Sequence, residues 1–278
     1  EMCIRDSLRP SQKRTIISAV TKTFSILLVG RTGTGKSSTI NSLLGRDAAP
    51  VGGVIPVTNK VECFDCPIND AIIRLYDTPG LCDSSDLSND DAYIGAIKDV
   101  LTSIDLVLFV TPLNETRVSR DERIALRSLS AAIGSDLWAN MIVLFSFANS
   151  RLPVQAEYAE FFQERSSAFR KFVEELCSEA EDSSDKVSEE LPFLAIDNTC
   201  QLTPDGCEWV PELFTLVVER CSASGVMPFV EALGAEVGSV DNSAGKDHTN
   251  PKNTEKKRIK LNEEQQQRVK RGLGRSVI

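Results

Sequence analysis

The sequence contains only one histidine, His248, which lies in a polar stretch near its C-terminal end. A Ser-His-Asp triad, a Cys-His pair and a histidine-based zinc site are therefore excluded from the rest of the chain. The eight cysteines are scattered, which favours reduced thiols over a disulfide framework. The sequence also lacks any run of 18 uncharged apolar residues, so no transmembrane helix is predicted. We expect a cytoplasmic protein, peripheral to an organelle membrane only through a partner or its basic tail.

Positive charge is scarce outside the C-terminal part of the chain. Lys and Arg number 31 against 40 Asp and Glu, which gives a formal net charge of −9 at pH 7. Residues 246–278 hold ten of the basic residues and four of the acidic ones, so the acidic excess lies before them. An acidic domain repels the phosphate backbone of nucleic acids. We therefore expect no specific nucleic-acid partner.

Short apolar runs alternate along the chain with stretches of helical period. The apolar runs predict strands over residues 24–29, 61–66, 71–77, 106–111, 141–147 and 192–197. The helical patterns predict helices over residues 36–44, 92–104, 120–133, 155–178 and 209–218. Strands that are apolar throughout are typical of a mainly parallel sheet covered by helices on both faces. The fold class predicted is therefore α/β, with three layers.

Three regions follow from this pattern. Residues 1–21 are expected to be an N-terminal extension, which an artefact at the start of the sequence would also explain. Residues 22–235 are expected to form the folded α/β domain. Residues 236–278 are polar and basic, and their low apolar content cannot offset the entropy of ordering, so we expect a disordered or marginally helical tail.

A phosphate-binding loop is the strongest functional signal. Residues 30–37 read Gly-Arg-Thr-Gly-Thr-Gly-Lys-Ser and match G-x-x-x-x-G-K-[ST] between a predicted strand and a predicted helix. Backbone N–H groups of such a loop, together with the helix N-terminus, attract phosphate. We predict that Lys36 reaches the β- and γ-phosphates and that Ser37 ligates Mg²⁺. The predicted nucleotide-binding residues here are Gly30, Arg31, Thr32, Gly33, Thr34, Gly35, Lys36, Ser37 and Ser38.

Two further elements favour a switch GTPase over a small-molecule kinase. Residues 77–80 read Asp-Thr-Pro-Gly, the D-x-x-G pattern in which Asp77 faces the metal through water and Gly80 faces the γ-phosphate. Thr58 lies between the two motifs and is predicted to close over Mg²⁺. The usual guanine motif [NT]-K-x-D is missing after the strand at 141–147, which excludes a Ras-like protein. The predicted metal-binding residues are thus Ser37, Thr58 and Asp77, and Lys36, Thr58 and Gly80 are predicted to be catalytic.

Several segments together identify a family. They are the phosphate loop with Ile-Asn-Ser-Leu-Leu-Gly at 40–45, Asp-Thr-Pro-Gly-Leu at 77–81, Asp-Leu-Val-Leu-Phe-Val at 105–110 and Leu-Pro-Phe-Leu-Ala-Ile-Asp-Asn at 191–198. Over residues 22–222 the sequence resembles the septin-related P-loop NTPase G domains of immunity-associated nucleotide-binding proteins (AIG/GIMAP type) and of chloroplast import receptor (TOC) GTPases. The resemblance implies that Asp197 and Asn198 read the guanine edge. It also places Phe147 against the base, where the family usually has histidine.

The resemblance implies GTP and GDP as ligands, Mg²⁺ as cofactor and a nucleotide-dependent homodimer. Arg117 matches an arginine that reaches across that dimer toward the partner's phosphates. Leu81 stands where Ras-like enzymes carry a water-positioning glutamine, so slow intrinsic hydrolysis is expected. The leading hypothesis is a slow GTPase that acts as a dimerising switch. The alternatives are a nucleotide-dependent assembly scaffold with incidental turnover and an ATP-specific P-loop NTPase.

Overall fold

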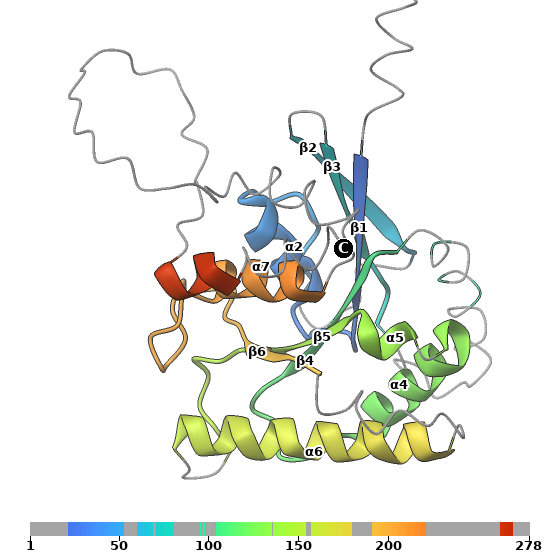
Figure 1. The fold of residues 1–278 in the computed structure, drawn as a ribbon, viewed down its shortest axis with the longest axis vertical. Helices are drawn as coiled ribbons and strands as arrows, with labels where there is room; N and C mark the ends of the chain where they lie inside the picture. The colour runs from blue at the N-terminus through green and yellow to red at the C-terminus, as the bar shows by residue number, and fades with distance from the viewer. Residues whose placement is uncertain are drawn as a thin grey trace, which may run out of the picture.

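The fold is built on one sheet whose six strands have the order β2-β3-β1-β4-β5-β6 (Figure 1). The computed structural model describes residues 22–52, 60–68, 71–80, 95, 97, 100, 104–134, 136–153, 157–179, 191–220 and 262–268. The strands are β1 (Lys22–Val29), β2 (Glu62–Ile68), β3 (Ala71–Asp77), β4 (Leu106–Pro112), β5 (Met141–Ser146) and β6 (Phe193–Ala195). All neighbouring strands run parallel except β2, which pairs antiparallel with β3 at the edge.

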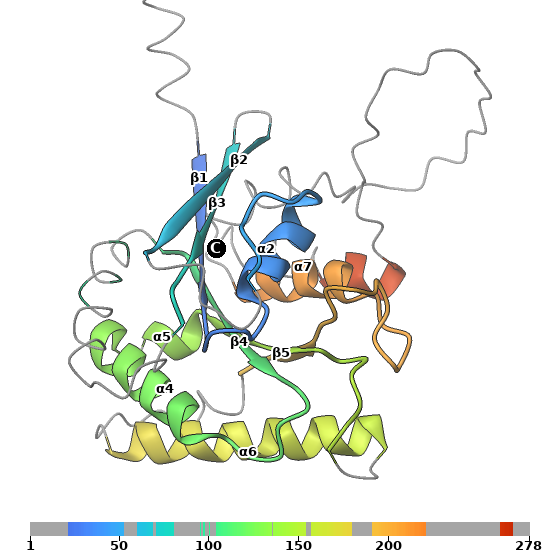
Figure 2. The same ribbon diagram turned by 180° about the vertical axis from the view of Figure 1, so that it is seen from behind.

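Helices cover both faces of the sheet (Figures 1 and 2). One face packs against α2 (Lys36–Leu44) and α7 (Trp209–Arg220), and the other against α4 (Arg120–Ile133), α5 (Asp136–Ala139) and α6 (Tyr158–Glu179). Each face has its own apolar core, with Phe214 in the first and Phe169 in the second, both fully buried. The predicted three-layer α/β class is confirmed. Within the ranges described above, no helix is both long and apolar enough to cross a bilayer.

Local sequence accounts for most element boundaries. Helix α4 begins after Ser119, whose side chain accepts a hydrogen bond from the Glu122 N–H while the Glu122 side chain accepts one from the Ser119 N–H. Helix α2 ends at Gly45, which has a left-handed backbone. The four-residue helix α5 was not predicted, because it is only about one helical turn long and shows no repeating apolar pattern. The predicted helix at 92–104 and the extension at 1–21 lie almost wholly outside the described residues.

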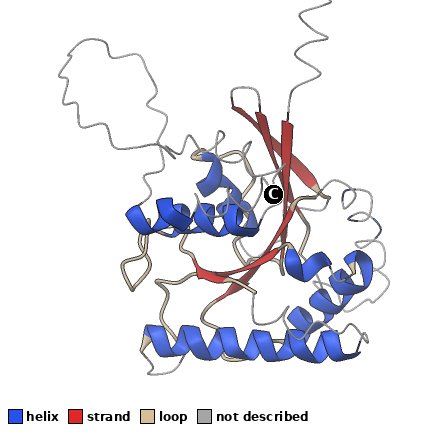
Figure 3. Ribbon diagram, in the orientation of Figure 1, coloured by secondary structure: helices blue, strands red, loops and turns tan. Residues whose placement is uncertain are grey.

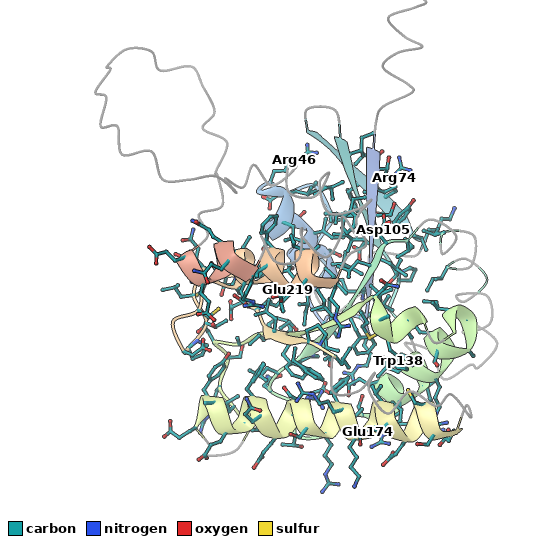
Figure 4. All side chains as sticks on the ribbon, in the orientation of Figure 1. Arg46, Arg74, Asp105, Trp138, Glu174 and Glu219 are labelled. Carbon is teal, nitrogen blue, oxygen red and sulfur yellow. The ribbon has the colours of Figure 1, made fainter. Side chains whose placement is uncertain are left out.

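One part of the tail is helical rather than disordered. Residues 262–268 include a short helix beside α7, drawn in red in Figure 1 and as helix in Figure 3. Asn262 and Gln265 cap each other reciprocally, and Gln265 also donates to Glu212 at 3.0 Å. Arg268 forms ion pairs with Glu212 and with Glu219, which Figure 4 labels on α7. Polar contacts to the acidic side of α7, rather than apolar content, thus hold this segment.

The topology brings the sequence motifs to one edge of the sheet. In parallel strands the carboxyl ends meet at the same edge, where α/β folds bind ligands. Leu28 near the end of β1 pairs with Asp77 at the end of β3, and Val29 pairs with Phe109 of β4. The phosphate loop, the D-x-x-G segment and the loops after β4, β5 and β6 therefore surround a common site.

Candidate functional site

The loop of residues 30–35 joins β1 to α2 with a backbone that only glycine permits. A Cβ on Gly30 would lie 2.1 Å from the carbonyl oxygen of Val110 in β4, so the loop passes directly over the neighbouring strand. Gly35 precedes α2 with a φ of 96°, in the left-handed region. The Thr34 hydroxyl donates to the carbonyl of Arg31 at 2.9 Å and closes the turn between them. The first turn of α2 therefore points its N–H groups into a preformed concave loop.

Lys36 extends across this loop instead of into solvent. Its Nζ donates to the carbonyl oxygens of Gly30 at 3.0 Å and Arg31 at 2.9 Å, and the side chain is buried. A buried ammonium group needs compensating negative charge or dipoles. The loop carbonyls and the nearby Asp77 carboxylate supply such compensation, and an anionic ligand would add to it. This geometry agrees with the predicted phosphate-binding role of Lys36.

Asp77 and Ser37 lie together beside the loop. The Ser37 hydroxyl donates to Asp77 Oδ2 at 2.5 Å, while Asp77 Oδ1 is buried without a hydrogen-bond partner. Burial raises the pKa of Asp77, although the hydrogen bond from Ser37 and the charge of Lys36 act in the opposite direction. The Thr78 hydroxyl donates to the Leu28 carbonyl at 2.7 Å and fixes the start of the D-x-x-G segment. Gly80 follows at the end of that described stretch, whereas Thr58 lies outside the described residues.

Phe147 is the first residue of the loop after β5. It is the only described residue other than glycine with a positive φ, 59°, and the residue is 38% exposed. Its ring atom Cζ lies 3.9 Å from the position that a Cβ on Gly35 would take. A strained backbone that holds an aromatic ring open to solvent beside a phosphate loop is typical of a ligand site.

Asp197 and Asn198, after β6, both hold the site together. Asp197 Oδ2 accepts from the backbone N–H of Asn149, and Oδ1 accepts from the N–H and hydroxyl of Thr199. Asn198 donates to Thr39 Oγ1 at 3.1 Å and accepts from the Ser42 hydroxyl at 3.0 Å. The Asp197 carboxylate thus already has three protein donors. Its predicted role as guanine acceptor competes with a role in joining the loops after β5 and β6.

Stability at acidic pH reports the state of Asp197. Burial raises its pKa, but the hydrogen bonds from Thr199 and Asn149 outweigh this effect and hold the pKa below its usual range. A depressed pKa means that the ionised carboxylate stabilises the fold above the unfolded-state value of about 4, and that this contribution is lost as the pH falls. We expect Asp197→Asn to lower the melting temperature at pH 7, and the difference from wild type to shrink as the pH falls to 3. A difference that persists unchanged at pH 3, measured by thermal unfolding, would contradict this assignment.

The side chain of Arg31, a predicted nucleotide-binding residue, extends toward the segment after β4. Its guanidinium Nη2 lies 3.3 Å from Glu115 Oε1 in the loop between β4 and α4, and Nη1 lies 3.9 Å from Asp121 Oδ2 in the first turn of α4. Arg31 Nη1 also donates to the Ser119 hydroxyl at 3.4 Å. Arg117, in the same loop, is exposed. Sequence reasoning missed Glu115, although acidic residues after a strand adjacent to β1 are a signal that could have identified it.

Comparison with known proteins identifies relatives over most of the folded part. Residues 24–181, more than half of the chain, match the sequence model of the AIG1 family. Translocase of chloroplast 34 from Pisum sativum is 28% identical over 210 residues, which are 70% of this chain and 64% of that protein. GTP-binding protein A from Dictyostelium discoideum is 28% identical over 203 residues, 66% of this chain and 43% of that protein. The chain therefore spans less than two thirds of the length of these relatives.

Solved structures of chloroplast translocon components, among them Toc33 from Arabidopsis thaliana, share the fold of this chain. Toc33 with Mg²⁺ and GMPPNP has a TM-score of 0.59 at 20% identity, over 82% of this chain and 94% of that one. A dimerization-deficient arginine-to-alanine mutant of Toc33 has a TM-score of 0.62 at 18% identity, with the same coverage. A third structure has a TM-score of 0.64 at 20% identity, over 73% of this chain and 85% of that one. It is described with the statement that dimerization is important for the GTPase activity of the chloroplast translocon components Toc33 and Toc159. At these identities the likeness establishes the fold.

Proposed function

Because this chain belongs to the AIG1 family, we propose that it binds GTP and GDP with Mg²⁺ and hydrolyses GTP slowly as a nucleotide-controlled dimerising switch. The observation that carries the proposal is the group formed by Lys36, Ser37 and Asp77. A buried ammonium, a hydroxyl and a carboxylate lie at the N-terminus of α2, with one carboxylate oxygen unpaired. This combination suits a polyphosphate with its cation.

The residues present fit a magnesium ion. Asp77 Oδ1 is a buried oxygen with no partner, and Mg²⁺ prefers hard oxygen ligands. Among the described residues no group of three His, Cys, Asp or Glu side chains could hold a metal, which agrees with an ion held mainly by phosphates and water. Ser37 would ligate the ion, Asp77 would hold it through water, and Thr58 is proposed as its switch ligand. When bound, Mg²⁺ neutralises charge on the β- and γ-phosphates.

The chain's own groups have distinct roles in this proposal. Lys36 binds the β- and γ-phosphates, and Gly80 offers a backbone N–H to the γ-phosphate. Phe147 stacks on the base, because its exposed ring lies beside the phosphate loop. Asn198 links the loop after β6 to α2, which holds the residues proposed to bind the base at a fixed distance from the phosphate loop. Guanine selectivity then depends on Asp197 and on backbone groups of the same loop.

Slow turnover and dimerisation complete the proposal. Leu81 cannot orient an attacking water, so a single protomer should hydrolyse GTP slowly. Arg117 is an exposed guanidinium beside the site and can reach the phosphates of a second copy. The dimerization reported for Toc33, and its loss in an arginine mutant, support this arrangement by analogy.

A nucleotide titration read together with mass in solution tests the proposed function. We expect GTP and GDP to bind more tightly than ATP, and the mass to approach that of a dimer when a transition-state mimic is present. Tighter binding of ATP would replace the GTPase by an ATP-specific NTPase. Nucleotide-dependent assembly without multiple turnover would favour the scaffold alternative.

Substitution of Arg117 tests the part of the proposal that concerns dimerisation. We expect Arg117→Ala to remove the increase of the hydrolysis rate with protein concentration, because a guanidinium supplied across an interface can contribute ~10³-fold or more. Hydrolysis assayed over a range of concentrations, with sedimentation in GDP and in the transition-state mimic, measures both effects. The control is Lys171→Ala, which removes an exposed cation from α6. Arg117→Ala that self-associates and turns over like wild type would contradict the arginine's role.

A further inference from the structure

Glu115 lies between two arginines that come from different parts of the fold. Its Oε1 is 3.3 Å from Arg31 Nη2 in the phosphate loop, and its Oε2 is 3.7 Å from Arg165 Nη2 in α6. Arg165 is itself buried and also pairs with the buried Glu122 at 2.8 Å. One carboxylate therefore connects the phosphate loop to the helix on the far side of the β4–α4 loop.

The β4–α4 loop, residues 113–119, is held at several points around its exposed tip. Leu113 and Val118 are buried, and Glu115 carries the two ion pairs described above. At the other end, the Ser119 N–H donates to Glu122 Oε2 and the Ser119 hydroxyl accepts from Arg31. Only the adjacent Thr116 and Arg117 stand out into solvent. The tip is thus fixed on both sides by contacts that lead to the phosphate loop.

The position of Glu115 is unfavourable for an isolated carboxylate. Burial and the nearby negative charge of Glu122 raise the pKa of Glu115, whereas Arg31 and Arg165 lower it. Its side chain is 26% exposed, so the carboxylate is partly removed from water. An uncompensated charge in such a place would be costly. The net effect leaves the pKa of Glu115 above its usual value, and the two guanidinium groups offset part of the cost of its charge.

We propose that Glu115 and Arg31 are positioning residues that fix Arg117 relative to the phosphate loop of their own protomer. Arg31 holds the β4–α4 loop with its side chain, while its carbonyl accepts from Lys36. Movement of the phosphate loop is thereby transmitted to the arginine that faces a second copy. This inference rests on the proposed function, because it assigns the residues that preset the dimer-facing arginine. Because the loop that carries Arg117 is already held in place, Arg117 can contact the second copy without a further loss of conformational entropy.

The test compares Glu115→Gln with a matched control. The Gln side chain has the same shape but lacks the charge, so it releases Arg31 without leaving a cavity. The control is Glu175→Gln, which removes a partner of Arg123 in an exposed ion pair between α4 and α6. GTP hydrolysis is measured over a range of protein concentrations, with nucleotide affinity and thermal unfolding measured in parallel. Arg117→Ala is assayed in the same series.

We expect Glu115→Gln to reduce the concentration-dependent acceleration about 10-fold or more, because displacement of a catalytic group can cost ~100-fold. The loss should be larger in that acceleration than in the rate at high dilution, and Glu175→Gln should behave like wild type. Arg31→Met combined with Glu115→Gln should lose less acceleration than the sum of the two single losses, since both break the Arg31–Glu115 pair while each residue also has a partner of its own.

The outcomes separate this inference from the function on which it rests. If Arg117→Ala loses the acceleration but Glu115→Gln retains it, the positioning role is wrong and the proposed switch stands. Additive losses in the double variant would also overturn the positioning role, because they show that the two residues act independently. If wild type binds no GTP or shows no acceleration with concentration, the proposed function fails, and the inference fails with it.

Discussion

Replacing Lys36 by alanine is expected to weaken GTP binding at least ~100-fold, which corresponds to about 2.7 kcal/mol. Lys36 is the only lysine of the phosphate-loop motif, and the folded part of the chain is acidic, so nearby charge cannot substitute for it. Its ammonium already lies buried at the loop, 3.0 Å from the Gly30 carbonyl. Titration of a fluorescent GTP analogue measures the loss.

Two comparisons make the Lys36 result specific. Lys171→Ala removes an exposed lysine from α6 and should leave the affinity at the wild-type value. Thermal unfolding of Lys36→Ala shows whether the loop survives the loss of two hydrogen bonds to its carbonyls. A folded Lys36→Ala protein with wild-type affinity for GTP would disprove the phosphate-site assignment and with it the proposed function.

Replacing Arg165 by methionine is expected to cost about 3–5 kcal/mol of unfolding free energy, because it leaves a buried carboxylate without its partner. Arg165 pairs with Glu122 at 2.8 Å, and both side chains are almost fully inaccessible. Two of the guanidinium nitrogens, Nε and Nη1, have no hydrogen-bond acceptor, but the group lies over the rings of Phe145 and Phe169. The aromatic faces compensate part of this deficit.

Chemical denaturation of Arg165→Met measures that loss, and Arg123→Met is the matched control. Arg123 also joins α4 to α6 through an ion pair and lies over Phe172, but its pair with Glu175 is exposed. Exposed pairs contribute little, so a much smaller change is expected. Combining Arg165→Met with Glu122→Gln should recover part of the stability, since no uncompensated charge then remains. Equal losses in Arg165→Met and Arg123→Met would show that burial adds nothing to the pair.

The parts of the site that were predictable depend on residues adjacent in the chain. The strand–loop–helix arrangement follows from the glycines, from the strand before them and from the helix after them, and Lys36 is the first residue of that helix. The start of α4 follows from the capping box of Ser119 and Glu122, three residues apart. Asp77 ends a mainly apolar strand that is interrupted by Arg74, so its place at the carboxyl edge of a parallel sheet was also foreseeable.

The less predictable parts depend on residues far apart in the chain. The direction of the Arg31 side chain is decided by Glu115, a residue 84 positions away. The Asp197 carboxylate is engaged by the loop after β5. The helix at 262–268 has a capping pair that could have been read from the sequence, but its stability depends on Glu212 and Glu219 of α7.

The sequence by itself determined the strand and helix pattern, the fold class and the phosphate loop, because these depend on hydrophobic period and on backbone preferences within a few residues. Tertiary structure alone decided which ion pairs and hydrogen bonds form between the loops at the edge of the sheet. Glu115 between Arg31 and Arg165, and Asp197 among three donors, result from strand order and helix packing. Ion pairs and hydrogen bonds act over a few ångströms in space, so separation along the chain does not reveal them.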